Sequence, residues 1–151
     1  MMRVVARDVD VDVTKPEPPL ADAREPGRVL IVEDDPGTAQ SLSSILRRAG
    51  YQPTICYNGA QALRSASDLA PAAAMVDIHL PDLNGLVITR KLRDQLGPRV
   101  PIIVVSGDTS METLNSLAHV GATYFLSKPT SPAVLLQMLG DCLIDSSRRA
   151  S

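Results

Sequence analysis

The sequence has few of the residues that cross-link small domains: it contains two cysteines and two histidines among 151 residues. Cys56 and Cys142 lie far apart and lack metal-ligand spacing, which argues against a disulfide framework and against zinc. We therefore expect two buried thiols and a reducing, cytoplasmic location. A chain of this length buries enough apolar surface to fold as one domain without such cross-links.

Strong charge and long apolar runs are also missing. The formal net charge is −2, from well-mixed signs, so the sequence shows no basic footprint for nucleic acid and no polybasic membrane patch. No segment is long and apolar enough to span a bilayer, and the N-terminus lacks the apolar core of a signal peptide. We expect neither direct nucleic-acid binding nor membrane insertion.

The first 26 residues differ in composition from the rest. Residues 9–13 alternate valine and aspartate like a strand, but Pro16, Pro18, Pro19 and Pro26 follow among scattered charges. This composition favours a flexible N-terminal tail over residues 1–26, although the Val/Asp stretch could dock on the domain. We place the folded domain at 27–146 and a C-terminal tail at 147–151.

From Arg28 onward, strand-like apolar runs alternate with segments of helical period, which predicts an α/β fold with a parallel sheet covered on both faces. The predicted strands cover 29–32, 53–57, 72–77, 102–105 and 124–127. The predicted helices begin at Pro36, Gly59, after Gly85, after a capping box at Thr109–Glu112, and at Pro132. The count is five strands and five helices.

Reactive side chains follow four of these predicted strands. Glu33-Asp34-Asp35 follows the first, Asp77 ends the third, Ser106 follows the fourth, and Lys128-Pro129 follows the fifth. Carboxylates at the ends of two buried strands suggest a metal site. Asp35 before Pro36 also reads as a helix N-cap, in which case Glu33 or Asp34 carries the metal chemistry.

This ordered set resembles the receiver domain of two-component response regulators, over about 120 residues from Arg28 to near Ser146. The resemblance includes the pattern Asp-x-x-x-Pro-x-x-x-Gly, formed by Asp77, Pro81 and Gly85. It implies a doubly wound five-stranded parallel sheet of the flavodoxin-like kind, with strand order 2-1-3-4-5. In that topology the ligand crevice opens at the carboxyl ends of the first and third strands.

The resemblance implies an acidic site for Mg²⁺ or Mn²⁺ built from Asp34 and Asp77, with Glu33 nearby. By family analogy the main-chain carbonyl of His79 is a further ligand. His119 most simply lies on a helix surface. Asp77 becomes the phosphoacceptor, because a carboxylate can attack phosphorus once the metal and the Lys128 ammonium neutralise the developing charge.

The resemblance also implies a switch. Ser106 would turn its hydroxyl toward the phosphoryl group, the loop after it would move inward, and Phe125 would fill the vacated space. The readout face would consist of the fourth helix, the strand 124–127 and the fifth helix, through which a homodimer can form. Lys128-Pro129 resembles the family's cis peptide, which aims the ammonium into the crevice.

Two positions depart from the commonest family pattern. Phe125 stands where tyrosine is frequent, so a readout through a phenol hydroxyl is missing. Thr130 stands where a large apolar residue is common. Both affect the output face and neither affects the phosphorylation site.

The resemblance predicts a phosphorylation-controlled regulator, rather than an enzyme, that accepts its phosphoryl group from a histidine kinase or a histidine phosphotransfer protein. The alternatives are a phosphorelay shuttle, a phosphate sink or the receiver part of a larger regulator, since no output domain follows the fifth helix. A haloacid-dehalogenase-like hydrolase would need a second acid where His79 stands, and a pseudo-receiver should have lost the acids. Flavin binding is disfavoured because the first strand–helix turn is acidic.

Overall fold

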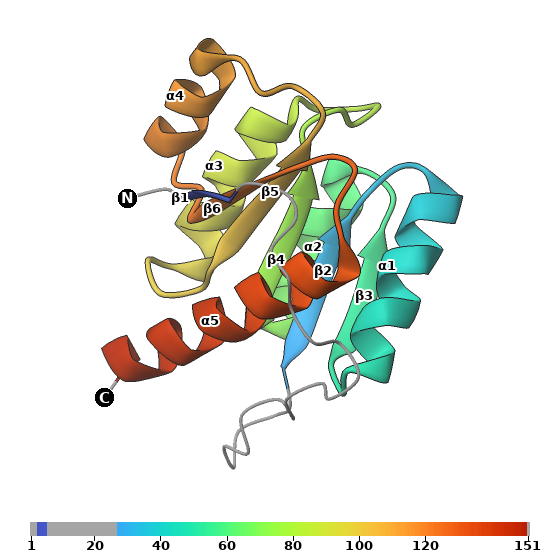
Figure 1. The fold of residues 1–151 in the computed structure, drawn as a ribbon. Coiled ribbons are helices and arrows are strands. Elements are labelled where there is room, and N and C mark those ends of the chain that lie inside the picture. The colour runs from blue at the N-terminus through green and yellow to red at the C-terminus, as the bar shows by residue number, and fades with distance from the viewer. Residues whose placement is uncertain (1–2, 6–26, 151) are drawn as a thin grey trace.

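The computed structural model describes the backbone of residues 3–5 and 27–150. One parallel sheet runs through the molecule in the order β1-β6-β5-β4-β2-β3 (Figure 1). The strands are β1 (Arg3–Val5), β2 (Arg28–Val32), β3 (Gln52–Cys56), β4 (Ala73–Asp77), β5 (Ile102–Ser106) and β6 (Tyr124–Ser127). Without β1, the remaining five strands have the predicted order 2-1-3-4-5, which is confirmed.

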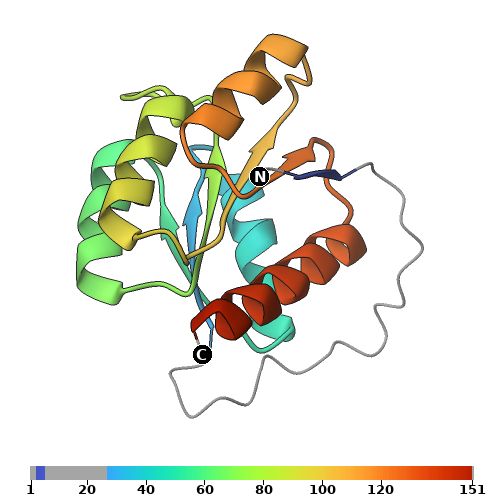
Figure 2. The same ribbon diagram turned by 90° about the vertical axis from the view of Figure 1, so that its left-hand side faces the viewer.

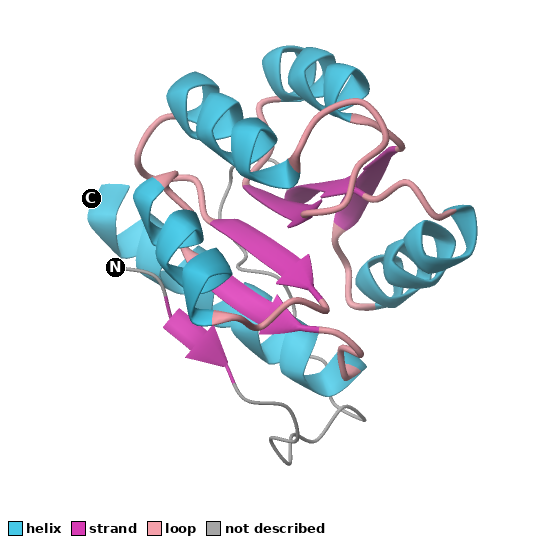
Figure 3. Cartoon of the chain, turned by 90° about the horizontal axis from the view of Figure 1, so that it is seen from above, coloured by secondary structure: helices cyan, strands magenta, loops and turns pink. Residues whose placement is uncertain are grey.

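Five helices connect the strands and lie on both faces of the sheet (Figure 3). They are α1 (Pro36–Arg48), α2 (Gly59–Leu69), α3 (Gly85–Leu96), α4 (Met111–His119) and α5 (Pro132–Ala150). Each predicted helix is present. None of the helices among the described residues is both long and apolar enough to cross a membrane.

The two faces of the sheet form separate hydrophobic cores. Successive β2 residues alternate between them: Ile31 packs with α1 and α5, whereas Leu30 packs with α2, α3 and α4. Both side chains are almost completely buried. Strands buried on both faces are continuous apolar runs, which explains why these strands were recognisable in the sequence.

Helix capping sets where the chain leaves the carboxyl ends of the strands. Asp35 caps α1, Asn58 caps α2 and Asn84 caps α3, each accepting from a backbone N–H of the first turn. For α4 the capping residue is Ser110, which accepts from the Thr113 N–H. The predicted capping box starting at Thr109 was therefore one residue too early, because serine competes with threonine for the same role.

Two predicted boundaries need correction. Residues 1–26 were assigned to a flexible tail, but Arg3–Val5 forms β1 and pairs with β6. An open sheet edge offers unsatisfied backbone groups to any nearby segment with strand-forming residues, and composition alone does not reveal this. Residues 6–26, including the Val/Asp stretch, lie outside the described residues. At the other end, α5 continues past residue 146 to Ala150, since residues 143–150 contain neither glycine nor proline.

Candidate functional site

The functional candidates gather at the carboxyl edge of the sheet. The chain order reverses between β2 and β4, which are neighbours although α1, β3 and α2 separate them in sequence. Asp77 ends β4 and Glu33 follows β2; their exposed fractions are 7% and 3%. Two carboxyl groups are therefore buried side by side at the point where parallel α/β sheets form ligand crevices.

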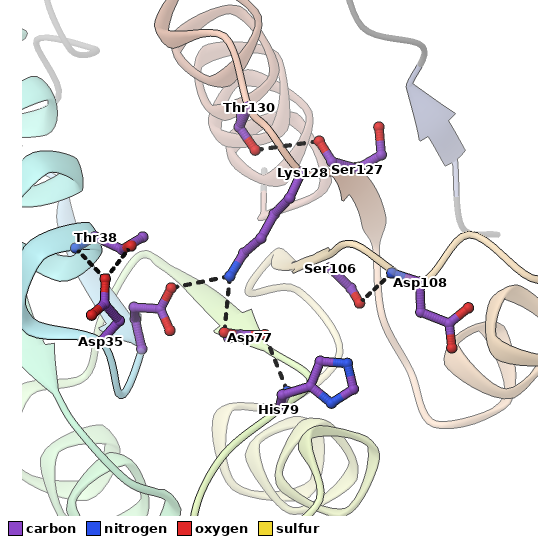
Figure 4. Close-up of polar contacts among 10 residues, drawn as sticks. Asp35, Thr38, Asp77, His79, Ser106, Asp108, Ser127, Lys128 and Thr130 are labelled. Carbon is purple, nitrogen blue, oxygen red and sulfur yellow. Dashed lines mark hydrogen bonds and ion pairs between the residues drawn. The ribbon is translucent and has the colours of Figure 1, made fainter.

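Lys128 reaches into this crevice from the loop after β6 (Figure 4). Its Nζ lies 3.0 Å from Oδ2 of Asp77 and 3.1 Å from Oε1 of Glu33. The Lys128–Pro129 peptide bond is cis, as the resemblance implied. One ammonium thus bridges two carboxyl groups that belong to different strand ends, and it holds both in fixed positions.

Burial and these contacts set the protonation states. Burial, together with the nearby Asp77 carboxylate, raises the pKa of Glu33 to about 7, although Lys128 opposes the shift. Burial also acts to raise the pKa of Asp77, but interactions with Glu33, Lys128 and the His79 N–H outweigh it and lower that pKa. The Lys128 pKa is raised, since its two carboxyl partners outweigh its desolvation. Asp77 is the ionised member of the acid pair, and Lys128 is charged.

The acids can hold a cation. Glu33, Asp34 and Asp77 each offer one carboxylate oxygen, and these oxygens lie within 4.8 Å of one another. Among the described side chains, Oε2 of Glu33 is buried and has no hydrogen-bond partner. An orphaned buried oxygen beside two further carboxylates matches the hard oxygen donors that Mg²⁺ prefers. The residues present fit a divalent cation.

Asp35 does not join this cluster. Its Oδ2 accepts hydrogen bonds from the N–H and Oγ1 of Thr38, at 2.9 and 2.6 Å, at the start of α1. These bonds lower the pKa of Asp35. The sequence left Glu33 and Asp34 open as metal-site acids, and the structure places both beside Asp77.

The loop between β4 and α3 is held against the site. The His79 N–H donates to Oδ1 of Asp77 at 3.1 Å, while the His79 ring extends away from that carboxylate (Figure 4). A Cβ at Gly85 would lie 2.3 Å from the Ile78 Cα, so only glycine fits there. Sequence reasoning missed Asp82, which accepts from the N–H groups of Gly59 and Ala60 and so ties this loop to α2. Its place next to Pro81 was the available signal.

Ser106 lies at the end of β5 and is fully buried. Its Oγ accepts a hydrogen bond from the Asp108 N–H at 3.0 Å (Figure 4). The Asp108 carboxylate accepts from Ser110 N at 2.9 Å and from Thr113 Oγ1 at 2.8 Å, in the first turn of α4. Sequence reasoning missed Asp108, although a polar run before a helix is a capping signal. A continuous chain of hydrogen bonds links Ser106 to α4.

Phe125 is completely buried and packs in the core beneath α2, α3 and α4. Thr130, the second departure from the family pattern, places its hydroxyl 3.4 Å from the Ser127 carbonyl oxygen within the β6–α5 loop. Both departures therefore lie in β6 and the loop after it, whereas the acids lie at the ends of β2 and β4.

Comparisons with known proteins agree with this geometry. The family model described as the response regulator receiver domain matches residues 29–140. The sensory/regulatory protein RpfC of Xanthomonas campestris is 33% identical over 128 residues, covering 82% of this chain and 18% of RpfC. A CheY-like receiver domain protein from Methanospirillum hungatei superposes with a TM-score of 0.78 at 29% identity, covering 82% of this chain and 98% of that chain.

The receiver domain of the sensor histidine kinase PA1611 from Pseudomonas aeruginosa, solved with a magnesium ion coordinated in its active-site cleft, is 33% identical with a TM-score of 0.72. The alignment covers 78% of this chain and 97% of that one. The chain belongs to the response regulator receiver domain family of two-component systems. It spans less than half the length of the curated relatives it matches.

Proposed function

We propose that this domain accepts a phosphoryl group on Asp77 from a phosphohistidine of a histidine kinase or phosphotransfer protein, or from a small acyl phosphate. The observation that carries the proposal is the Asp77 carboxylate, which is buried, ionised and held 3.0 Å from the Lys128 ammonium beside an unpartnered Glu33 oxygen. A carboxylate in this setting is a nucleophile with charge compensation already in position.

Glu33, Asp34 and Asp77 are the side chains that would hold Mg²⁺ or Mn²⁺, with the His79 carbonyl as a main-chain ligand. A bound cation would neutralise charge on the transferring phosphoryl group. The PA1611 receiver domain, with magnesium in its cleft, supports this assignment by similarity. Because the pKa of Glu33 is raised to about 7, a cation held by Glu33 would compete with a proton for the same carboxylate.

In the transfer step an Asp77 oxygen bonds to phosphorus as the bond from phosphorus to the donor nitrogen breaks. The electron pair of that bond returns to the donor imidazole. Lys128 compensates the charge of the phosphoryl oxygens, and hydrolysis of the aspartyl phosphate resets the domain. The protein is thus a switch that turns over only its own phosphoryl group, rather than an enzyme acting on a separate substrate.

The phosphorylated state alters the Ser106–Asp108 hydrogen bond. If the Ser106 hydroxyl turns to a phosphoryl oxygen, the Asp108 N–H loses its acceptor, and the Asp108 cap on the first turn of α4 is free to move. Phe125, which belongs to the same core cluster as Leu117 of α4, then repacks. The face of α4, β6 and α5 transmits the change to a partner or a second copy, in the cytoplasm and without direct nucleic-acid contact. The alternative is a phosphorelay shuttle, in which this face does not respond.

The test is phosphoryl labelling with acetyl phosphate and with a panel of histidine kinases, followed by mass spectrometry. We expect Mg²⁺-dependent labelling of the wild type and of Asp68→Asn, a control that alters an exposed acid on α2. Asp77→Asn should remain unlabelled. Equal labelling of Asp77→Asn and the wild type, or full labelling in chelator, contradicts the proposal.

A further inference from the structure

Strand β1 lies on the outer side of β6, where the sheet would otherwise end. The two strands are parallel, with Arg3 opposite Tyr124, Val4 opposite Phe125 and Val5 opposite Leu126. Figures 1 and 2 both show this short dark-blue strand beside β6. The outer hydrogen-bonding side of β6 is thus occupied by residues from the chain's own N-terminus.

The two strands that would form the edges of the five-stranded sheet differ in how they resist pairing. Outer strand β3 contains Pro53, which cannot donate to a ladder and blocks pairing with another chain. Strand β6 reads Tyr-Phe-Leu-Ser, with neither proline nor charge. Apolar, uncharged edges of this kind are the ones that pair with other molecules. Only β6 lacks a deterrent in its own sequence, and β6 is the strand that β1 covers.

We propose that β1 is an intramolecular cover for the β6 edge, and that its release lets a second copy of this chain pair there, β6 against β6. The occupant is a second copy because a two-fold axis makes one edge complementary to itself, and β6 carries no charge that would oppose its twin. This inference goes beyond the proposed function. It rests on that function only in one respect, namely that β6 is part of the proposed readout face.

The cover is short, and the number of residues that join it to β2 is large enough for it to leave β6 without unfolding the domain. Three residues pair with β6, whereas residues 6–27 join β1 to β2. That connection spans up to about 70 Å when extended, at roughly 3.3 Å per residue. The four strand spacings from β1 to β2 amount to only about 19 Å. The tether therefore permits both the covered and the open state.

A full-length variant carrying Val4→Pro and Val5→Pro tests the cover. Adjacent strand residues direct their amides to opposite sides, so the pair of prolines removes at least one donor that faces β6. The control carries Val9→Pro and Val11→Pro, the same change outside the described strand. Sedimentation over a range of concentrations measures self-association, and hydrogen exchange measures protection of residues 124–126.

In dilute solution we expect faster exchange at residues 124–126 in the variant than in the wild type or the control. We also expect at least about tenfold tighter self-association, because β1 no longer occupies the β6 edge in most molecules. Protection at 124–126 should return as the variant associates. Unchanged association, unchanged exchange, or association without renewed protection at 124–126 would each overturn the proposal. Labelling of Asp77 is measured on the same samples. If the wild type were not labelled, the proposed function would be refuted, but the result on self-association would still hold.

Discussion

Lys128 and Asp77 are 51 residues apart in the sequence, yet the Lys128 Nζ lies 3.0 Å from the Asp77 Oδ2. The same ammonium contacts Glu33, from a third strand end. The positions of these three side chains, at the ends of β2, β4 and β6, are therefore fixed relative to one another. Lys128 favours the ionised form of both acids, but Asp77 also interacts with Glu33 and accepts from the His79 N–H, which lowers its pKa, whereas burial and the Asp77 carboxylate leave Glu33 with a pKa of about 7.

Lys128→Met should lower phosphoryl uptake by Asp77 by about a hundredfold or more, because it removes the ammonium that compensates charge in transfer. Lys91→Met, at an exposed site on α3, is the matched control. Initial rates of labelling with acetyl phosphate provide the measurement, and circular dichroism checks that both variants fold. If both lysine variants were labelled at the same rate, Lys128 would have no part in the transfer.

Asp34→Ala should weaken Mg²⁺ binding far more than Asp35→Ala does. Asp34 belongs to the acid cluster, whereas Asp35 caps α1 through Thr38. Conversely, Asp35→Ala should lower the melting temperature more than Asp34→Ala does. Calorimetric titration with Mg²⁺ and thermal melts separate the two effects. Comparable losses of affinity at both positions would mean that the metal acids are assigned one residue too early.

Stability in chelator should fall as pH rises from 5 to 8. The folded-state pKa of Glu33 is raised from 4.5 to about 7. Between these two pH values the folded protein therefore binds more protons than the unfolded chain does. The contribution of protonated Glu33 to the free energy of unfolding is complete below pH 4.5 and is lost as the pH rises through 7. Its size is up to about 3 kcal/mol. Asp77, whose pKa is lowered, contributes in the opposite sense and only in the acid range.

Urea unfolding of the wild type and of Glu33→Gln provides the measurement. The glutamine variant should lose most of the decline between pH 5 and 8, and Mg²⁺ should restore the wild type at pH 8 by binding the folded state. Parallel curves for the two proteins would show that Glu33 is not the titrating group.

Ser106→Ala should still accept the phosphoryl group while losing much of the α4 response, since it lacks the hydroxyl that turns to the phosphoryl oxygen.

Asp108→Ala should raise hydrogen exchange in the first turn of α4 even without phosphorylation, because the Ser110 and Thr113 donors lose their acceptor. Asp94→Ala, an exposed acid on α3, is the control. The readout is exchange across residues 111–128 with and without beryllium fluoride; an identical response in all four proteins would favour a passive phosphate shuttle.

A chain that begins at Gly27 should fold and take up phosphoryl groups on Asp77, because the described side chains of both hydrophobic cores run from Val29 onward. It also lacks β1, so it should self-associate as the double-proline variant does. Circular dichroism, labelling and sedimentation are the three measurements. A truncated chain that failed to fold would show that β1 contributes to the domain rather than covering its edge.

The sequence by itself determined the five strands of the core and the strand ends that carry the acids, Ser106 and Lys128, whereas the strand order was what the family resemblance implied. The strands and their ends are local signals: buried parallel strands are continuous apolar runs, and the residues that stop them are polar and capped. It also left Asp35 open between a cap and a metal acid, since one carboxylate after a strand suits both roles. Distances within one turn of α1 resolve that choice.

Only the tertiary structure decided which groups meet and how they are charged. The contact of Lys128 with Asp77 and Glu33 depends on three strands lying in one sheet, and the raised pKa of Glu33 depends on burial, which no local pattern encodes. The pairing of Arg3–Val5 with β6 is equally non-local: three residues carry too weak a signal alone, and the β6 edge that they cover exists only once the sheet has formed.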